Sequence, residues 1–121
     1  MDQFSRTRQL LGDCRMEKIQ QSTVAVFGLG AVGSFVTEAL ARTGVGTLHL
    51  IDFDQVDVSN INRQLFALHS TVGQNKAAIA CQRVKDIYPQ CNVVTHSSFV
   101  NADSLEALLS PDFDVVVDAI D

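Results

Sequence analysis

The pattern of hydrophobic and polar positions changes along the chain between short apolar runs and segments with a helical period. This pattern predicts strands separated by helices. The run Thr-Val-Ala-Val-Phe at 23–27 is short, apolar and rich in β-branched residues, which is typical of a strand buried on both faces of a parallel sheet. Segments 47–52, 92–96 and 114–118 have a similar texture and predict three further strands, the last of them also buried.

Helical periodicity occupies the intervals between these strands. A second amphipathic pattern covers 77–88 and ends at Pro89, a short helix is expected over 104–109, and residues 2–20 predict one or two short helices broken at Gly12. The polar segment 53–73 is expected to be an irregular loop with a turn of helix near 63–68. After the first strand, apolar residues recur at a helical period and predict one buried helix face: Val32, Phe35, Val36, Ala39 and Leu40.

The order of these elements predicts an α/β fold with a Rossmann-like, doubly wound and mainly parallel sheet. Right-handed crossovers make 3-2-1-4 the simplest strand order. We divide the chain into an N-terminal helical segment, 1–22, and the nucleotide-binding half of a larger domain, 23–121. The sequence stops directly after a core strand that a further helix would be expected to cover, so we expect a truncated fragment.

Composition and charge narrow the classes of protein. The net charge of −5 gives no general electrostatic footprint for nucleic-acid phosphates, so any RNA-binding surface is expected elsewhere. There is no apolar run of about 18 residues and no signal-peptide layout, which favours a cytoplasmic protein. Three cysteines without C-x-x-C spacing argue against a disulfide framework or a local zinc site.

The strongest chemical signal is the glycine-rich turn between the first strand and the helix that follows it. Gly28, Gly30 and Gly33 form G-x-G-x-x-G, which places backbone N–H groups and the positive end of a helix dipole against a phosphate. Asp52, at the end of the second strand and about 20 residues further on, can bond both ribose hydroxyls. This combination predicts a nucleotide site, and both NAD and ATP offer the required phosphate and ribose.

Polar residues beyond the second strand favour ATP over NAD. Lys76 is expected in a helical first turn, where the dipole disfavours a cation unless phosphates are bound. Asp121 follows strand four at the ligand-binding edge of the sheet, where a carboxylate facing phosphates needs an intervening Mg²⁺. An ordinary NAD site has no need of Asn60, Arg63 or Lys76.

Other polar side chains are expected to serve the fold. Asp54 and Asp57 are expected to cap turns in the loop rather than to contact a ligand. His49, His69 and His96 show no metal-ligand spacing and are assigned no chemistry. The cysteines are likewise assigned no catalytic role: Cys81 is expected in the core and Cys91 in a turn.

Four segments together resemble the ThiF/MoeB/HesA family of ubiquitin-activating-like adenylating enzymes: the glycine loop with its strand, Ile-Asp-Phe-Asp-Gln-Val-Asp-Val-Ser-Asn-Ile-Asn-Arg-Gln at 51–64, Val-Gly-Gln-Asn-Lys at 72–76 and Val-Asp-Ala-Ile-Asp at 117–121. The resemblance implies that the protein binds ATP and Mg²⁺, adenylates a carboxylate and releases pyrophosphate.

Residue roles follow from the resemblance position by position. It implies that Gly28, Gly30 and Gly33 form the nucleotide loop and that Asp52 holds the ribose. Asn60, Arg63 and Lys76 match the triphosphate-handling residues, and Gln64 matches a further position of the nucleotide site. Asp121 matches the magnesium aspartate, and Arg6 matches an N-terminal arginine that reaches the partner's ATP in a homodimer. Arg63, Lys76, Asp121 and Arg6 are therefore the expected catalytic residues.

Within the family, two groups of substrates remain in view. Phe-Ser-Arg-Thr at 4–7 and Asn-Ile-Asn-Arg-Gln at 60–64 resemble the branch that dehydrates threonylcarbamoyladenosine in tRNA. The alternative is the branch that activates a ubiquitin-like sulfur carrier, and the family resemblance also suggests a cysteine desulfurase or sulfur acceptor as partner. An NAD(P)-dependent oxidoreductase domain and a catalytically silent scaffold are the remaining hypotheses.

Overall fold

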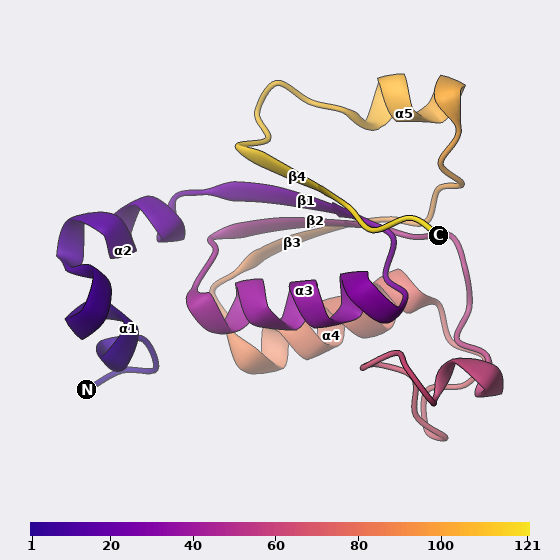
Figure 1. The fold of residues 1–121 in the computed structure, drawn as a ribbon, viewed down its shortest axis with the longest axis horizontal. Helices are drawn as coiled ribbons and strands as arrows, with labels where there is room; N and C mark the ends of the chain where they lie inside the picture. The colour runs from indigo at the N-terminus through magenta and orange to yellow at the C-terminus, as the bar shows by residue number, and fades with distance from the viewer.

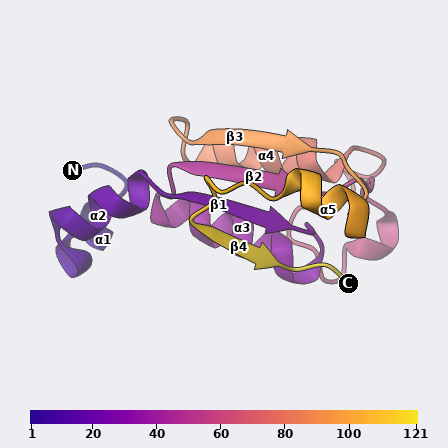
Figure 2. The same cartoon turned by 90° about the horizontal axis from the view of Figure 1, so that it is seen from above.

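A computed structural model describes all 121 residues and contains one four-stranded sheet in the order β3-β2-β1-β4. Its strands are β1 (Thr23–Phe27), β2 (Thr47–Ile51), β3 (Asn92–His96) and β4 (Val115–Asp118), and all neighbouring pairs are parallel. The predicted Rossmann-like order 3-2-1-4 is therefore confirmed. Figure 2 shows the four strands running in the same direction, so that their carboxyl ends share one edge.

The helices divide between the two faces of the sheet. Figure 1 shows α3 (Ala31–Thr43) and α4 (Lys76–Ile87) side by side on one face and α5 (Ala102–Leu108) on the other. The short helices α1 (Ser5–Leu11) and α2 (Asp13–Gln20) lie beyond the amino end of the sheet. No helix has the length and apolar character needed to cross a membrane.

Two apolar clusters hold these layers together. The larger one fills the space between the sheet and the helices α3 and α4, with Leu48, Leu50 and Val84 fully buried. Cys91 follows the turn at Pro89 and belongs to this cluster, where its Sγ lies 3.4 Å from the carbonyl oxygen of Val45. Burial raises the pKa of the Cys91 thiol, which accords with a structural role.

The predicted buried face of α3 is only partly correct, because Val36 and Leu40 pack against the larger cluster whereas Val32, Phe35 and Ala39 are exposed. Val32 and Phe35 are 63% and 56% exposed, whereas the buried residues of this helix are Gly33, Ser34, Thr37 and Ala41. Small residues let the helix approach the glycine loop closely, and their polar groups are satisfied locally: the hydroxyl of Thr37 donates to the carbonyl of Gly33 at 2.8 Å. Val32 and Phe35 consequently point outward, while Val36 and Leu40 pack against the core.

The predicted burial of the fourth strand is also wrong. Val115 and Val116 of β4 are about half exposed, because β4 is an edge strand that pairs with β1 alone. The helical turn expected near 63–68 is found earlier in the loop, as the 3₁₀ turn η1 (Val58–Asn60), because Asp57 and Asn60 form a reciprocal capping box around it.

The face covered by α5 carries a histidine pair with a predicted effect on stability. Burial, followed by the neighbouring His96, lowers the pKa of His49 below its usual 6.5. The folded state therefore binds fewer protons than the unfolded state, and stability is lost as the pH falls from about 6.5 through the folded value. We expect the thermal midpoint to fall between about pH 7.5 and pH 5.5, and this fall to be smaller in His49→Gln. An unchanged pH dependence in His49→Gln, with His69→Gln as the control, would contradict this assignment.

Candidate functional site

A cavity of about 270 Å³ opens where the carboxyl ends of β1, β2 and β4 meet the loops that follow them. In parallel α/β sheets this edge is where ligands bind. The cavity is lined by both glycine-loop and distant residues: Gly28, Gly30, Ile51, Asp52, Phe53, Asp54, Gln64, Lys76, Ser98, Phe99, Val100, Ala119, Ile120 and Asp121.

Gly28 and Gly30 shape the floor of the cavity. Gly28 has φ +94°, and a Cβ there would lie 2.6 Å from the carbonyl oxygen of Ala119, so only glycine fits between β1 and the end of β4. At Gly30 a Cβ would meet only the Gln64 amide, at 3.6 Å, which leaves this backbone open to a ligand. Helix α3 begins directly after Gly30, and its first N–H groups have no partners earlier in the helix. These groups can receive an anion.

Asp52 is held rigidly by the loops on either side of it. Its Oδ2 accepts the N–H of Leu29 at 2.8 Å, and its Oδ1 accepts the N–H of Asp54 at 2.8 Å. An ionised carboxylate offers about four acceptor sites, so each oxygen keeps a lone pair for a further donor. The carboxylate therefore ties the glycine loop to the end of β2 and can still accept two ribose hydroxyls.

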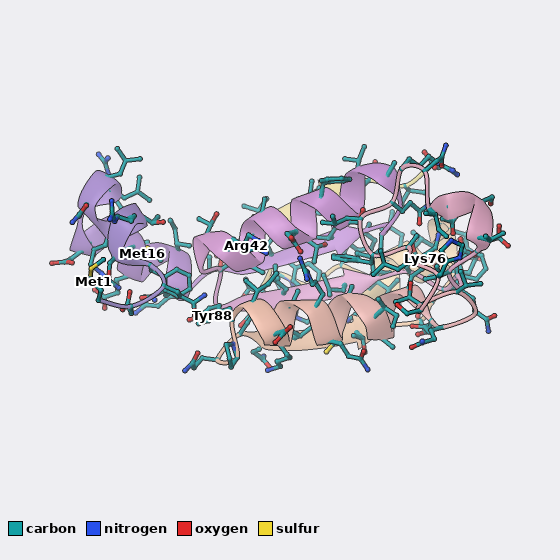
Figure 3. The ribbon with its side chains drawn as sticks, turned by 90° about the horizontal axis from the view of Figure 1, so that it is seen from below. Met1, Met16, Arg42, Lys76 and Tyr88 are labelled. Carbon is teal, nitrogen blue, oxygen red and sulfur yellow. The ribbon has the colours of Figure 1, made fainter.

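Lys76 is the first residue of α4 and is only 8% exposed. Figure 3 places it at the end of the molecule opposite Met1 and Met16. Its ammonium nitrogen lies 3.8 Å from Oδ2 of Asp54, and the backbone N–H of Lys76 donates to the backbone carbonyl of Asp54 at 3.0 Å. A cation at a helix N-terminus opposes the dipole, so a bound polyphosphate would relieve that repulsion.

Asp54, which the sequence analysis expected to cap a turn, lines the cavity beside Lys76. It connects two elements of the site: its N–H fixes Asp52, while its carbonyl and carboxylate fix the start of α4. Asp57, by contrast, caps η1 as expected and accepts the N–H of Ser59 at 2.9 Å.

Asn75 sets the position of Lys76 by capping α4. Its Oδ1 accepts the N–H of Ala78 at 3.0 Å. Loss of such a cap costs about 1 kcal/mol, so Asn75→Ala is expected to lower the free energy of unfolding by that amount in urea denaturation. Asn75→Ser keeps an acceptor at the cap and is expected to stay close to the wild type; equal losses in both variants would count against the cap.

Several predicted site residues do not line the cavity. Asn60 is buried, and its side chain accepts the N–H of Asp57, so it shapes the loop. Arg63 is exposed and donates to the carbonyl of Ser59 at 2.9 Å. Gly33 lies behind the loop, where a Cβ would fall 1.7 Å from the carbonyl oxygen of Gly28. Arg6 is exposed on α1, at the far end of the molecule from Lys76 (Figures 1 and 3).

The structure adds an aromatic wall that the sequence reasoning missed. The rings of Phe53 and Phe99 meet edge to face with centroids 5.0 Å apart, and both residues line the cavity. Ser98 and Val100 lie beside them in the same wall. Position in the chain could have indicated this wall, because residues 98–100 come shortly after the end of β3, at the edge of the sheet where ligands bind.

The carboxylates of the cavity suit a Mg²⁺ ion that takes most of its ligands from phosphate and water. Asp121 and Asp54 supply carboxylates to the same cavity, and no cluster of three or more metal-ligating side chains exists in the chain. Mg²⁺ typically takes one or two carboxylates, with phosphate oxygens and water filling an octahedron. These residues therefore fit an ion that arrives with a nucleotide.

The fold and this site define a class of protein. Residues 4–121 match the ThiF family, and the chain belongs to that family.

Several of the proteins that this chain is similar to have a function in their names. The chain is 46% identical over 121 residues to the tRNA threonylcarbamoyladenosine dehydratase of Bacillus subtilis, covering 100% of this chain and 48% of the relative. The ATP complex of the Escherichia coli enzyme superposes with a TM-score of 0.96 at 40% identity, covering 98% of this chain and 49% of that one. The Anopheles gambiae adenylyltransferase and sulfurtransferase MOCS3 is 34% identical over 104 residues, 86% of this chain and 23% of that protein. The chain spans about half the length of the two dehydratases.

Proposed function

We propose that this chain forms the ATP-binding part of an adenylating enzyme whose substrate is tRNA bearing threonylcarbamoyladenosine. The observation that carries the proposal is the convergence of Gly30, Asp52 and Lys76 on one cavity, in a fold that superposes closely on a dehydratase with bound ATP. The two dehydratase relatives that match nearly the whole chain at 40–46% identity support the choice of substrate.

Each group at the cavity has a role in this proposal. Asp52 accepts the ribose hydroxyls, and the glycine loop donates backbone N–H groups to phosphate oxygens. Lys76 and Gln64 approach the same phosphates from α4 and from the loop before it. The aromatic wall of Phe53 and Phe99 offers an apolar surface to the adenine base. Asp121 and the phosphates would hold Mg²⁺, which when bound would supply charge neutralisation on the oxygens of the transferring group.

The proposed reaction has two steps. A carboxylate oxygen of the threonine-derived group attacks the α-phosphorus of ATP, and pyrophosphate leaves. A heteroatom of the carbamoyl group then attacks the activated carbonyl carbon and gives up its proton, and AMP leaves with the former carboxylate oxygen. The net result is loss of water driven by ATP. Lys76 stabilises negative charge on the phosphate oxygens during the first step. We also propose a cytoplasmic location, which a tRNA substrate and an ATP cofactor favour.

Arg6, Arg63 and Asn60 enter the proposal indirectly. Arg6 belongs to α1, which lies at the opposite end of the molecule from the cavity, and we propose that it reaches the ATP of the partner in a homodimer. The outward apolar residues of α3, Val32 and Phe35, offer surface for such an association. Arg63 reaches a nucleotide only after exchanging its bond to Ser59, whereas Asn60 acts by holding the loop.

The similarity to MOCS3 supports one alternative, adenylation of a ubiquitin-like sulfur carrier with a cysteine desulfurase as partner. Exchange of labelled pyrophosphate into ATP separates the two functions, because exchange requires the substrate whose carboxylate forms the adenylate. The native protein, purified from its own organism, is incubated with ATP and Mg²⁺. Either the modified tRNA or a sulfur carrier is then added. We expect exchange only with the modified tRNA. Exchange with the carrier alone would support the alternative and overturn the proposed substrate.

A further inference from the structure

Two histidines that the proposed reaction does not use lie against each other on the face of the sheet covered by α5. Nδ1 of His49, on β2, and Nε2 of His96, at the end of β3, are 3.1 Å apart. The rings are nearly parallel, with 17° between their planes, and both side chains are partly exposed. Adjacent parallel strands thus present two imidazole nitrogens to the same point.

The separation of these nitrogens matches two neighbouring ligands on one metal ion. With metal–nitrogen bonds of about 2.0–2.1 Å, two ligands lie about 2.9 Å apart at a right angle and about 3.4 Å apart at the tetrahedral angle. The observed 3.1 Å lies between these values. The two nitrogens now share a hydrogen bond, so binding an ion requires that at least one ring rotates until both lone pairs point toward it.

The surroundings of the pair also suit a metal. The ring of Phe113 lies 4.7 Å from that of His49 and restrains it from one side. The neighbouring part of this face is apolar, with Ala25, Phe27 and Ile51 at its centre and Leu105 packed on them.

We propose that His49 and His96 form a two-histidine binding site for a divalent transition-metal ion of the Zn²⁺ or Ni²⁺ class. The ion takes the place of the proton that now lies between the two nitrogens. That proton leaves Nδ1 of His49 or Nε2 of His96, and the same ring takes up a proton on its other nitrogen, so the charge of that ring does not change. Water completes the coordination, because no third side-chain ligand lies beside the pair.

This site is adjacent to the nucleotide cavity but separate from it. The carbonyl oxygen of His96 accepts the N–H of Asp52 at 3.0 Å. A bound ion would cross-link β2 and β3 where the proposed ribose carboxylate is held. We therefore expect the ion to raise the thermal midpoint of the chain.

Calorimetric titration of the untagged chain with Ni²⁺ tests the proposal at about pH 7.5, since Ni²⁺ favours imidazole over the exposed Cys14 thiol. We expect one ion per chain and a loss of affinity of roughly a hundredfold in His49→Gln and in His96→Gln, because each leaves a single ligand. His69→Gln, which changes the exposed third histidine, is the matched control and should bind as the wild type does. Equal affinity in all four proteins, or no saturable binding, would overturn the proposal.

A second measurement needs no variant and covers the case in which a substitution disturbs the fold. Paramagnetic Ni²⁺ broadens the nuclear magnetic resonance signals of amides close to it. We expect broadening to be concentrated in the second half of β2 and at the end of β3. Broadening centred on His69 or on Cys14 would show that the ion binds elsewhere and would exclude the proposed site.

Discussion

Replacing Lys76 by methionine is expected to weaken ATP binding by about 10- to 150-fold. The ammonium is the cation at the cavity wall, and a hydrogen bond to a charged group contributes about 1.5–3 kcal/mol. Methionine is close to lysine in length and can fill the same partly buried path without the charge. Isothermal calorimetry with ATP and Mg²⁺ measures the loss directly.

Two comparisons make the Lys76 result interpretable. Lys18→Met introduces the same chemical change at an exposed position of α2 and should leave ATP affinity unchanged. The thermal midpoint of Lys76→Met should stay close to that of the wild type, because its partner Asp54 is half exposed and such pairs contribute little. A folded Lys76→Met chain that binds ATP as tightly as the wild type would remove Lys76 from the site.

Replacing Gly33 by alanine is expected to destabilise the fold by about 3 kcal/mol or more. The new Cβ would lie 1.7 Å from the backbone carbonyl oxygen of Gly28, and no side-chain rotation can relieve a clash with backbone. Helix α3 must then move away from the glycine loop, which separates its buried residues Thr37 and Ala41 from their contacts. Urea denaturation of the variant measures the change.

Gly30→Ala is the matched control because it places the same methyl group three residues earlier. Its Cβ would meet only the side-chain amide of Gln64, at 3.6 Å, so the fold should be retained. The methyl group would, however, occupy the backbone surface offered to the phosphates, so ATP affinity should fall. A stable Gly33→Ala chain, or an unstable Gly30→Ala chain, would contradict the packing described for this loop.

The strand order could be predicted because it follows from local patterns and one chiral rule. Four short apolar runs separated by helical periods imply right-handed crossovers, and 3-2-1-4 is then the simplest arrangement. Apolar periodicity predicted only part of the buried face of α3. It found Val36 and Leu40, but this helix uses Gly33 and Thr37 for close approach and turns Phe35 outward. Apolar periodicity predicts the buried face of a helix only where large apolar side chains make the contact. It fails where small residues are needed for a close approach of two backbones.

The site was predictable where residues follow directly from strand ends and helix starts. Asp52 and Lys76 occupy such positions, so their places at the cavity follow from the element boundaries. Asp54, Phe99 and the pair of His49 with His96 depend on how a loop turns or on which residues of neighbouring strands lie opposite each other. Spacing along the sequence does not show how a loop turns or which residues of neighbouring strands are paired. The ligand roles of Arg6 and Arg63 stay predictions.

A titration of the isotopically labelled chain with ATP and Mg²⁺, followed by nuclear magnetic resonance, tests the central claim most directly, because it detects weak as well as tight binding. We predict saturable shifts of the Leu29, Asp54 and Lys76 amides, since these groups surround the cavity and contact Asp52 or its neighbours. NADH should not displace the nucleotide. Shifts centred away from the cavity, or bound NADH that ATP fails to displace, would contradict an ATP site built on Asp52 and Lys76.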